Sequence, residues 1–269
     1  EFESIESSAI IEDGEVKGIE AVQPNSARKL IENFMIAANV EMAEFIEARG
    51  WSSLRRVVKE PKYWDGIRRI AEKYVETLPE HADQPALAAF LARRREADPL
   101  HFPDLSLSII KLIGSGEYVV ERPGEDAGGH FGLAVRDYAH STAPNRRYAD
   151  LVVQRIVKAL IAGENAPYPA DGLERIAQHL NTQERAARKV ERKMRKIAAA
   201  YVMRSRIGER FEAVVTGVTP SGTFARIIRP PVDGRVERNE DGLNVGEKIN
   251  VTLISADPGR GFIDFAANR

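Results

Sequence analysis

The chain has 269 residues, of which 43% are hydrophobic and 29% charged, a composition typical of a globular protein with one large or two smaller domains. It contains no cysteine and no apolar run that could span a bilayer, so we expect no disulfides, no membrane partner, and a reducing compartment such as the cytoplasm. The formal net charge of −1 excludes nucleic-acid binding through overall charge and leaves only local basic patches for that purpose.

The first predicted element is a β-hairpin. Residues 1–6 alternate like a strand, and the turn Glu12-Asp13-Gly14 leads into a second strand over residues 16–19. Because the sequence begins within a predicted sheet, we expect a further segment to precede it.

A long helix is predicted next, from a cap at Asn25 or Ser26 to Gly50. Its apolar positions cover a broad face, which favours a helix of the protein core. Glu32 and Asn39 are polar exceptions near that face, and solvated positions are the simplest interpretation of both.

Shorter elements precede residue 130. Two amphipathic helices are predicted over residues 61–78 and 85–97, the second capped by Asp83, and a short helix is predicted over residues 104–114. Residues 118–120 have the composition of a strand.

The stretch after residue 130 contains the residues best suited to ligand binding or catalysis. Residues 130–135 alternate like a strand, and a turn at residues 144–145 precedes a predicted helix that ends at Gly163 and carries Arg146 and Arg147 in its first turn. The helix dipole disfavours cations there, whereas free backbone N–H groups together with two guanidinium groups suit a phosphate.

Two interpretations of these arginines are open. In one, Arg146 pairs with Asp150 and Arg147 is solvated, an arrangement worth roughly a few tenths of a kcal/mol. In the other, both arginines serve a bound phosphate. We favour the phosphate, because it also accounts for the polar side chains that precede the arginines: Tyr138, His140 and Thr142.

The same stretch resembles a known signature. The run His-Phe-Gly-Leu-Ala at 130–134, followed by Tyr-x-His-x-Thr-x-Pro-x-Arg-Arg-Tyr-x-Asp-Leu-Val-Val-x-Arg at 138–155, is similar to the later part of the catalytic (RNB) domain of the RNase II/RNase R family of 3′→5′ exoribonucleases. The chain departs from the family pattern by having Ala143 for Ser, Asn145 for Ile, Ala149 for Pro and Gln154 for His. None of these departures removes an arginine.

Further helices are predicted over residues 172–179 and from Asn181 to about Arg206, with Asn181 and Glu184 as a capping box. The predicted inner stripe of the second helix is Ala187, Val190, Met194, Ile197, Ala198 and Tyr201. Its outer faces are basic: Arg185, Arg188, Lys189, Arg192, Lys193, Arg195 and Lys196. Glu191 lies among these cations, and pairing with Arg195 is its simplest interpretation.

From Gly208 the pattern changes to short strands and turns, predicted over residues 211–218, 223–228, 232–236, 245–254 and 262–265. Their spacing favours a small five-stranded barrel. It resembles the OB-fold RNA-binding module that ends RNase II and RNase R. Phe224 and Arg226 alternate with apolar neighbours, so that Phe224 either stacks on a base together with Arg226 or packs in the barrel core.

The resemblance implies an activity and roles for individual residues. In the family, Mg²⁺ held by aspartates activates water at the last phosphodiester of single-stranded RNA, and nucleoside 5′-monophosphates are released. Arg146 would contact the scissile phosphate, and Arg147 and Tyr148 would hold neighbouring phosphates or Arg146 itself. The further positions implied for substrate or catalysis are Phe2 (base stacking), Glu32 (a sugar), Glu191 (near the active centre), and His130, Tyr138 and His140 of the motif.

The sequence contains no recognisable cluster of carboxylates that would bind the metal ion. The acidic residues at the turns Glu12-Asp13-Gly14 and Glu240-Asp241-Gly242 are typical of solvated loop tips, and the family's metal-binding aspartates lie upstream of the matching segment. We therefore expect Mg²⁺ to be bound by an upstream segment of the same enzyme, on one chain or two, and this chain alone to be inactive.

Together these observations predict an α+β multidomain protein: the later part of a mixed α/β RNB-type catalytic domain over residues 1–206, and an OB-fold barrel over residues 207–269. The expected function is a Mg²⁺-dependent 3′→5′ exoribonuclease. The alternative is a non-catalytic module that binds single-stranded RNA through the basic helix and the barrel.

Overall fold

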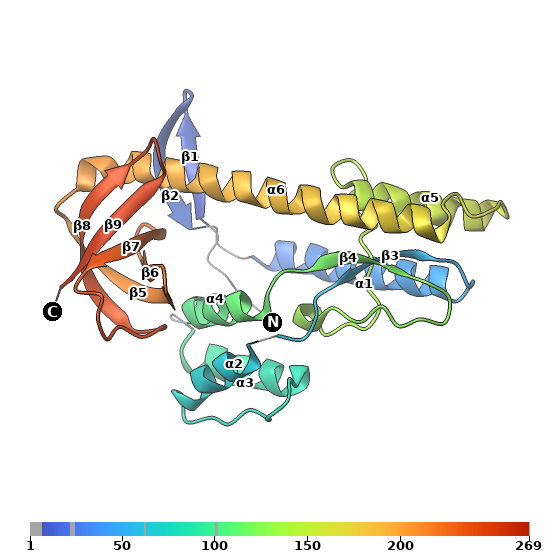
Figure 1. Cartoon of the computed structure of the whole chain (residues 1–269), viewed down its shortest axis with the longest axis horizontal. Coiled ribbons are helices and arrows are strands. Elements are labelled where there is room, and N and C mark those ends of the chain that lie inside the picture. Colours follow the sequence, from blue (N-terminus) through green and yellow to red (C-terminus); the bar gives the residue numbers. More distant parts are fainter. Residues whose placement is uncertain (1–6, 22–24, 62, 100–101, 269) are drawn as a thin grey trace. The chain divides into compact units, whose positions relative to one another are not determined.

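The computed structural model describes residues 7–21, 25–61, 63–99 and 102–268 (Figure 1). The chain forms two compact units, which are described separately. The first comprises residues 24–96 and 110–186, and the second residues 2–23, 97–109 and 187–269. Among the described helices, none is both long enough and apolar enough to cross a membrane.

The core of the first unit lies between three helices and a two-stranded ribbon. The helices are α1 (Ser26–Glu47), α5 (Tyr148–Ala162) and the first half of α6 (Ala170–Met203), and the ribbon pairs β3 (Ser53–Val57) with β4 (Glu117–Glu121) in antiparallel register (Figure 1). The residues buried between them include Ala43, Ile46, Leu54, Tyr118, Val152, Val153, Ile156 and Leu173. Strand β3 was not predicted.

Three shorter helices are α2 (Trp64–Glu72), α3 (Gln84–Ala97) and α4 (Phe102–Ile113). The cap predicted for α3 is confirmed, because Asp83 Oδ1 accepts a hydrogen bond from the backbone N–H of Ala86 at 2.8 Å. The prediction of a helix over residues 61–78 is too long at its end, since Val75 has a positive φ of 60°. Helix α4 begins at Phe102, before the predicted start at residue 104.

Helix α1 is only half a core helix. Its N-terminal cap at Asn25 is confirmed, but only its C-terminal half is buried, around Ala43. Leu30, Ile31 and Phe34 in the N-terminal half are each more than half exposed. The broad apolar face predicted from the sequence therefore exists, and the described residues cover only part of it.

The strand predicted over residues 130–135 is wrong. Residues Phe131–Leu133 form one turn of 3₁₀ helix, and Ala134 follows in the left-handed conformation with φ 59°. Only His130 keeps strand-like pairing, in isolated bridges to Val58 and Val135. Alternation of apolar and polar residues predicted a strand, but the segment meets the edge of the β3–β4 ribbon at single points.

The start of α5 also differs from the prediction. The helix begins at Tyr148, with Arg147 as its N-cap residue, so both arginines precede the first turn instead of lying in it. The backbone N–H groups of Arg146 and Arg147 donate to Ala143 O, at 3.2 and 3.0 Å. These bonds close a tight turn that ends where the helix starts.

Helix α6 runs without interruption over 34 residues, so the predicted break near Asn181 is wrong. Asn181 and Glu184 do not form a capping box, because their side chains bind the ribbon and Arg56, as described below. The predicted inner stripe is wrong: Ala187, Val190, Met194 and Tyr201 are exposed, and Ile197 and Ala198 are only half-buried. The side chains of this stretch that lie in the core of the second unit are instead Ala199, Ala200 and Met203.

The second unit contains a closed five-stranded barrel of order β5-β6-β7-β9-β8. Its strands are β5 (Arg210–Thr219), β6 (Gly222–Ile227), β7 (Val232–Arg238), β8 (Lys248–Asp257) and β9 (Phe262–Asn268), shown in orange to red in Figure 1. β7 and β9 pair in parallel and the other neighbours are antiparallel. The predicted barrel is confirmed, and each predicted strand overlaps an observed one.

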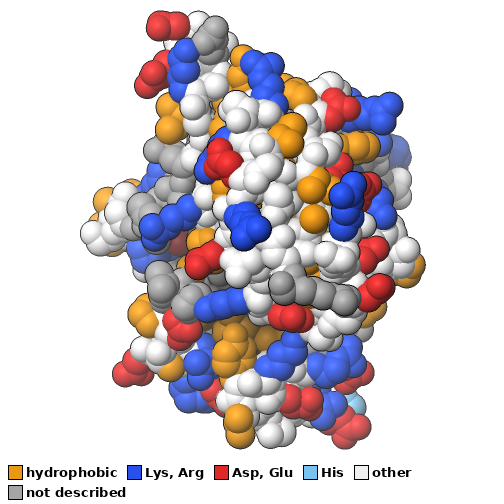
Figure 2. All heavy atoms as spheres, turned by 90° about the vertical axis from the view of Figure 1, so that its left-hand side faces the viewer, with side chains coloured by type: hydrophobic (Ala, Val, Ile, Leu, Met, Phe, Trp, Pro, Cys, Tyr) orange, Lys and Arg blue, Asp and Glu red, His pale blue; other side chains and the backbone are white. Residues whose placement is uncertain are grey.

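Side chains of alternate residues fill the barrel, including Ala213, Ala225, Ile227, Val236, Val251, Leu253 and Phe265. Gly234 allows the closest approach, since a Cβ atom there would lie 2.4 Å from the Phe265 ring. The unit also holds the hairpin of β1 (Ser7–Glu12) and β2 (Glu15–Ala21), whose predicted turn at Asp13 and Gly14 is confirmed by their positive φ angles. On the face in Figure 2, basic and acidic side chains are interspersed, in keeping with the net charge.

Candidate functional site

The motif residues form a loop that two helices hold from either side. From α1, the buried Asn39 accepts hydrogen bonds at Oδ1 from the backbone N–H and the hydroxyl of Ser141, both at 2.9 Å. Its Nδ2 donates to the Tyr138 hydroxyl at 3.1 Å. From the ribbon, Arg56 N donates to Tyr138 O at 2.7 Å. The loop is therefore fixed at its first half by residues about a hundred positions away in the chain.

Helix α5 holds the second half of the loop. The fully buried Asp150 accepts from Ala143 N–H at 2.8 Å and from Arg147 Nη2 at 2.8 Å, both at Oδ1. Gln154 Nε2 donates to Ser141 O at 2.7 Å. Thus the backbone before and after Thr142 is tied to α5 by side chains of its first two turns.

The two arginines have different surroundings. Arg147 forms the ion pair with Asp150, so the interpretation in which Arg146 takes that role is wrong. The reason is the late start of α5, which places Arg147 three residues before Asp150 and Arg146 outside the helix. Arg146 is exposed and makes no hydrogen bond or ion pair to any residue that the structure describes. Its guanidinium group is available to an anion.

Beside the loop lies a cluster of aromatic rings and imidazoles. Tyr118 Oη and His140 Nδ1 are 2.8 Å apart, and the His130, Tyr138 and His140 rings meet edge to face with centroids 5.3 and 5.7 Å apart. Burial lowers the pKa of His130 to about 4, and burial together with the nearby Arg147 and Arg56 lowers that of His140 to about 3. Both imidazoles are therefore neutral at pH 7.

The buried Arg56 supports this cluster, a role that the sequence did not predict. Arg56 of β3 makes two hydrogen bonds to the Glu184 carboxylate, at 2.7 and 2.8 Å, and its guanidinium lies 4.6 Å from the Tyr118 ring centroid. Asn181 holds both the N–H and the C=O of Tyr118, at 2.7 and 2.8 Å. The pair Asn181 and Glu184, read from the sequence as a helix cap, instead fixes the ribbon to α6.

A cavity of about 570 Å³ opens between the N-terminal half of α1 and the motif. It is mainly apolar, and its lining residues include Glu32, Ile31, Met35, Leu133 and Tyr138. Glu32 is exposed at the rim, where it pairs with Lys29 at 3.2 Å. The structure thus brings two predicted substrate residues, Glu32 and Tyr138, to one cavity.

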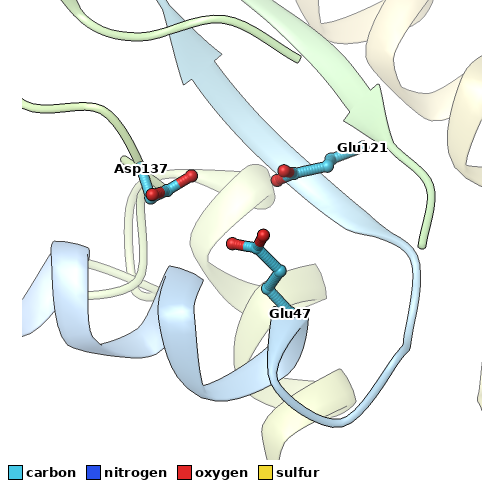
Figure 3. A group of neighbouring side chains, drawn as sticks. All are labelled: Glu47, Glu121 and Asp137. Carbon is cyan, nitrogen blue, oxygen red and sulfur yellow. The ribbon is translucent and has the colours of Figure 1, made fainter. Parts of the chain in front are cut away.

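One group of carboxylates resembles a metal site, and its surroundings argue against that role. Glu47, Glu121 and Asp137 point toward one another from α1, β4 and the loop after the 3₁₀ turn (Figure 3). The buried Arg55 pairs with Glu121 and lies 3.3 Å from Glu47, and Asp137 raises its pKa against the lowering by burial. The Arg55 guanidinium group already occupies two of the three carboxylates, so a divalent cation could bind the trio only by displacing a buried ion pair.

The other predicted residues belong to α5, to α6 and to the barrel. Tyr148 opens α5 and is exposed by 47%. Phe224 is half-buried on the outer face of β6, not in the barrel core, and Arg226 on the same strand pairs with Asp233 through both Nε and Nη2. Glu191 is exposed and pairs with Arg195, as its simplest interpretation predicted. Phe2 lies outside the described residues.

Comparison with family models settles the class of the chain. Residues 1–163 match the RNB domain, and residues 209–268 match the RNase II-type exonuclease C-terminal S1 domain. The chain belongs to the RNB family. The resemblance stated from the motif is thereby confirmed, as is the prediction of an RNB-type fold followed by an OB-fold barrel.

Individual relatives and solved structures are similar to this chain over most of its length. Ribonuclease R of Aquifex aeolicus is 31% identical over 250 residues, which cover 89% of this chain and 34% of that protein. The apo form of Mycoplasma genitalium RNase R superposes with a TM-score of 0.86 at 18% identity, over 98% of this chain and 45% of that one. Yeast Ssd1, described as a pseudonuclease, gives a TM-score of 0.63 at 20% identity, over 83% of this chain and 28% of that one. The chain spans about a third of the length of the curated relatives it matches.

Proposed function

We propose that this chain is the later part of a 3′→5′ exoribonuclease that hydrolyses single-stranded RNA to nucleoside 5′-monophosphates. The observation that carries the proposal is Arg146, a cation without a partner among the described residues, at the end of a loop that carries the RNB motif and is fixed by buried hydrogen bonds. Ribonuclease R of M. genitalium has been solved with ribose-methylated single-stranded RNA, which supports the substrate class.

Hydrolysis of a phosphodiester requires that the negative charge developing on the phosphate be stabilised. When water attacks the phosphorus of the last phosphodiester and the bond to the 3′ oxygen breaks, negative charge builds on the non-bridging oxygens. The planar fork of Arg146 can donate two parallel hydrogen bonds to those oxygens. His130 and His140, being neutral, add no positive charge, so the arginine is the cation of this loop that faces solvent.

Other residues would bind the rest of the substrate. The mainly apolar cavity with Glu32 at its rim and Tyr138 in its wall suits a terminal nucleoside, with the carboxylate accepting from a sugar hydroxyl. Tyr148, exposed beside the arginines, would contact a neighbouring phosphate. On the barrel, Phe224 would stack on a base and Arg226 would lie near the backbone of the RNA. Glu191 remains a candidate for the active centre on resemblance alone.

The reaction also needs a metal ion, and we propose that it is Mg²⁺ bound outside the described residues. The carboxylate trio around Arg55 could bind it only by displacing a buried ion pair. The exposed apolar residues Leu30, Ile31 and Phe34 on α1 are suited to contact the segment that carries the metal ligands, on the same chain or a separate one. We further propose a catalytic part over residues 1–206, an RNA-binding part over 207–269, and a cytoplasmic location.

The alternative is a module that binds single-stranded RNA without hydrolysing it. The RNB fold by itself does not decide against this, since Ssd1 shares the fold and is described as a pseudonuclease. Arg146 favours the enzyme, because its planar fork on a fixed backbone suits the charge that develops on a phosphate in the transition state.

A degradation assay decides between the two. A short 5′-labelled single-stranded RNA is incubated with Mg²⁺ and either this chain alone or the chain together with the upstream part of its RNB domain. We expect binding without turnover by the chain alone and stepwise release of mononucleotides by the assembly. Binding with no turnover in the Mg²⁺-loaded assembly would establish the alternative, and turnover by the chain alone would place the metal ligands within it.

A further inference from the structure

The position of Arg146 depends on its backbone. The side chain is exposed and finds no partner among the described residues, so neighbouring side chains do not orient it. What fixes its Cα is the turn closed by Ala143 O, which accepts from the N–H groups of both Arg146 and Arg147. Anything that holds Ala143 and Ser141 in place therefore also holds Arg146.

Asp150 holds the end of this loop and neutralises one of its two arginines. Its Oδ1 accepts from Ala143 N–H and from Arg147 Nη2, and the carboxylate is fully buried. A buried carboxylate that binds a backbone N–H and a guanidinium at once sets the spacing between them. Arg147 is thereby drawn toward α5 and is not free to bind the phosphate as Arg146 is.

Asn39 holds the beginning of the loop from the opposite side. Its amide is fully buried and uses Oδ1 for the Ser141 N–H and hydroxyl, and Nδ2 for the Tyr138 hydroxyl. Because the amide is buried, loss of its side chain would leave the Ser141 N–H without its partner in the interior. The two clamps, Asn39 and Asp150, lie on different helices and act on residues only two apart in the loop.

We propose that Asp150 and Asn39 are positioning residues for Arg146: together they fix the loop 141–147 and engage Arg147, so that Arg146 alone is presented to the phosphate. This inference rests on the proposed function. It assigns the two adjacent arginines different tasks, with Arg147 as part of the support and Arg146 as the group that touches the substrate.

The test is a double-mutant cycle in the active assembly of this chain with the upstream part of its RNB domain. Asp150→Ala should lower kcat by about 10- to 100-fold, as expected for a misplacement near 1 Å, with KM changed by no more than about twofold. Asp150→Asn keeps an acceptor for Ala143 N–H and should recover part of the loss. In the Arg146→Ala background, measured with excess enzyme in single turnover, Asp150→Ala should cost nothing further.

A merely structural role gives a different result. Asp150→Ala would then lower turnover by the same factor in both backgrounds, and that additivity would overturn the proposal. Asp83→Ala is the matched control, because it removes a half-buried carboxylate that accepts from a backbone N–H in the same unit, at the start of α3 and without touching the loop. It should lower the melting temperature and leave kcat unchanged.

Two further arms keep the outcome clear. If Asp150→Ala does not fold, Asn39→Ala and Asp150→Asn go through the same cycle. In the chain alone, hydrogen exchange of the Ser141 and Ala143 amides should be slow and should become fast in Asn39→Ala and Asp150→Ala, respectively; fast exchange in the unmutated chain would contradict the clamp. If Arg146→Ala turns over normally, the proposed function fails, whereas loss of turnover with an additive cycle refutes only the positioning roles.

Discussion

Arg55 and Arg146 lie in the same unit and have opposite surroundings. Arg55 is buried, pairs with Glu121 and Glu47, and interacts electrostatically with Asp137. Figure 3 shows these three carboxylates. Arg146 is exposed and has no partner among the described residues, while its neighbour Arg147 is held by Asp150. The difference shows how one residue type serves two purposes. A cation surrounded by carboxylates holds elements together, and a cation left without them on a fixed backbone is ready to bind an anion.

The largest effect should come from the buried member of this comparison. Arg55→Met leaves the Glu121 carboxylate buried without its cation, so we expect the free energy of unfolding to fall by about 3–5 kcal/mol. Urea denaturation of the chain measures it. Arg175→Met is the control, because its ion pair with Asp171 is exposed by 72% on both sides and should be worth no more than about 1 kcal/mol. Equal losses for the two variants would contradict the assignment of Arg55 to the core.

The exposed member should affect turnover and not stability. Arg146→Ala should reduce kcat of the active assembly about a hundredfold or more, with the melting temperature and most of the RNA affinity unchanged, since the guanidinium acts mainly in the transition state. Arg146→Lys should also fail, because an ammonium cannot reproduce the planar fork. Arg136→Ala, which removes an exposed arginine nearby in the chain, should leave turnover intact. Near-normal kcat in Arg146→Ala would refute its role.

A smaller effect is expected on the barrel. Because Phe224 lies half-buried on the outer face of β6, Phe224→Ala should weaken binding of single-stranded RNA by about tenfold with little change in melting temperature. Phe211 is buried in the barrel, so Phe211→Ala should instead lower the melting temperature. Fluorescence anisotropy and thermal unfolding of both variants separate the two roles. A Phe224→Ala variant with a lower melting temperature and normal RNA affinity would show that this side chain packs in the barrel core.

The smallest effect concerns pH. The unfolded chain takes up protons on histidine near pH 6.5, whereas the pKa values of His130 and His140 in the folded unit are about 4 and about 3. Their contribution to stability is therefore complete above pH 6.5 and is lost progressively as the pH falls from there to about 4 for His130 and to about 3 for His140. The urea midpoints should decline from pH 7.5 through pH 6 to pH 5, and His140→Gln should make this decline smaller. A midpoint independent of pH over this range would be incompatible with buried neutral imidazoles.

Elements governed by local patterns were predictable from the sequence. The five barrel strands alternate inward and outward residues between turns, and the caps at Asn25 and Asp83 act within three residues of the helices that they start. The RNB motif was also recognisable, because its arginines are adjacent in the chain. In each case the partners that decide the structure are close neighbours in sequence.

Features that depend on distant partners were not predictable in the same way. Strand β3 was missed because two adjacent arginines, Arg55 and Arg56, argue against a buried strand until Glu121 and Glu184 are known to pair with them. Asn181 and Glu184 matched a capping box, but Tyr118 and Arg56 bind them instead. The polar Asn39 on the apolar face of α1 was the one visible sign of the support for the loop, and its partner Ser141 is 102 residues away.

The closure of the barrel has a consequence for how it meets other molecules. Every strand from β5 to β9 has a hydrogen-bonded neighbour on both sides, so the barrel has no edge strand. A partner strand cannot extend this sheet, and neighbouring copies cannot join edge to edge into fibrils through it. Any ligand of the barrel must therefore be bound by side chains on its outer surface. Single substitutions there can change which ligand is bound without a change in the backbone.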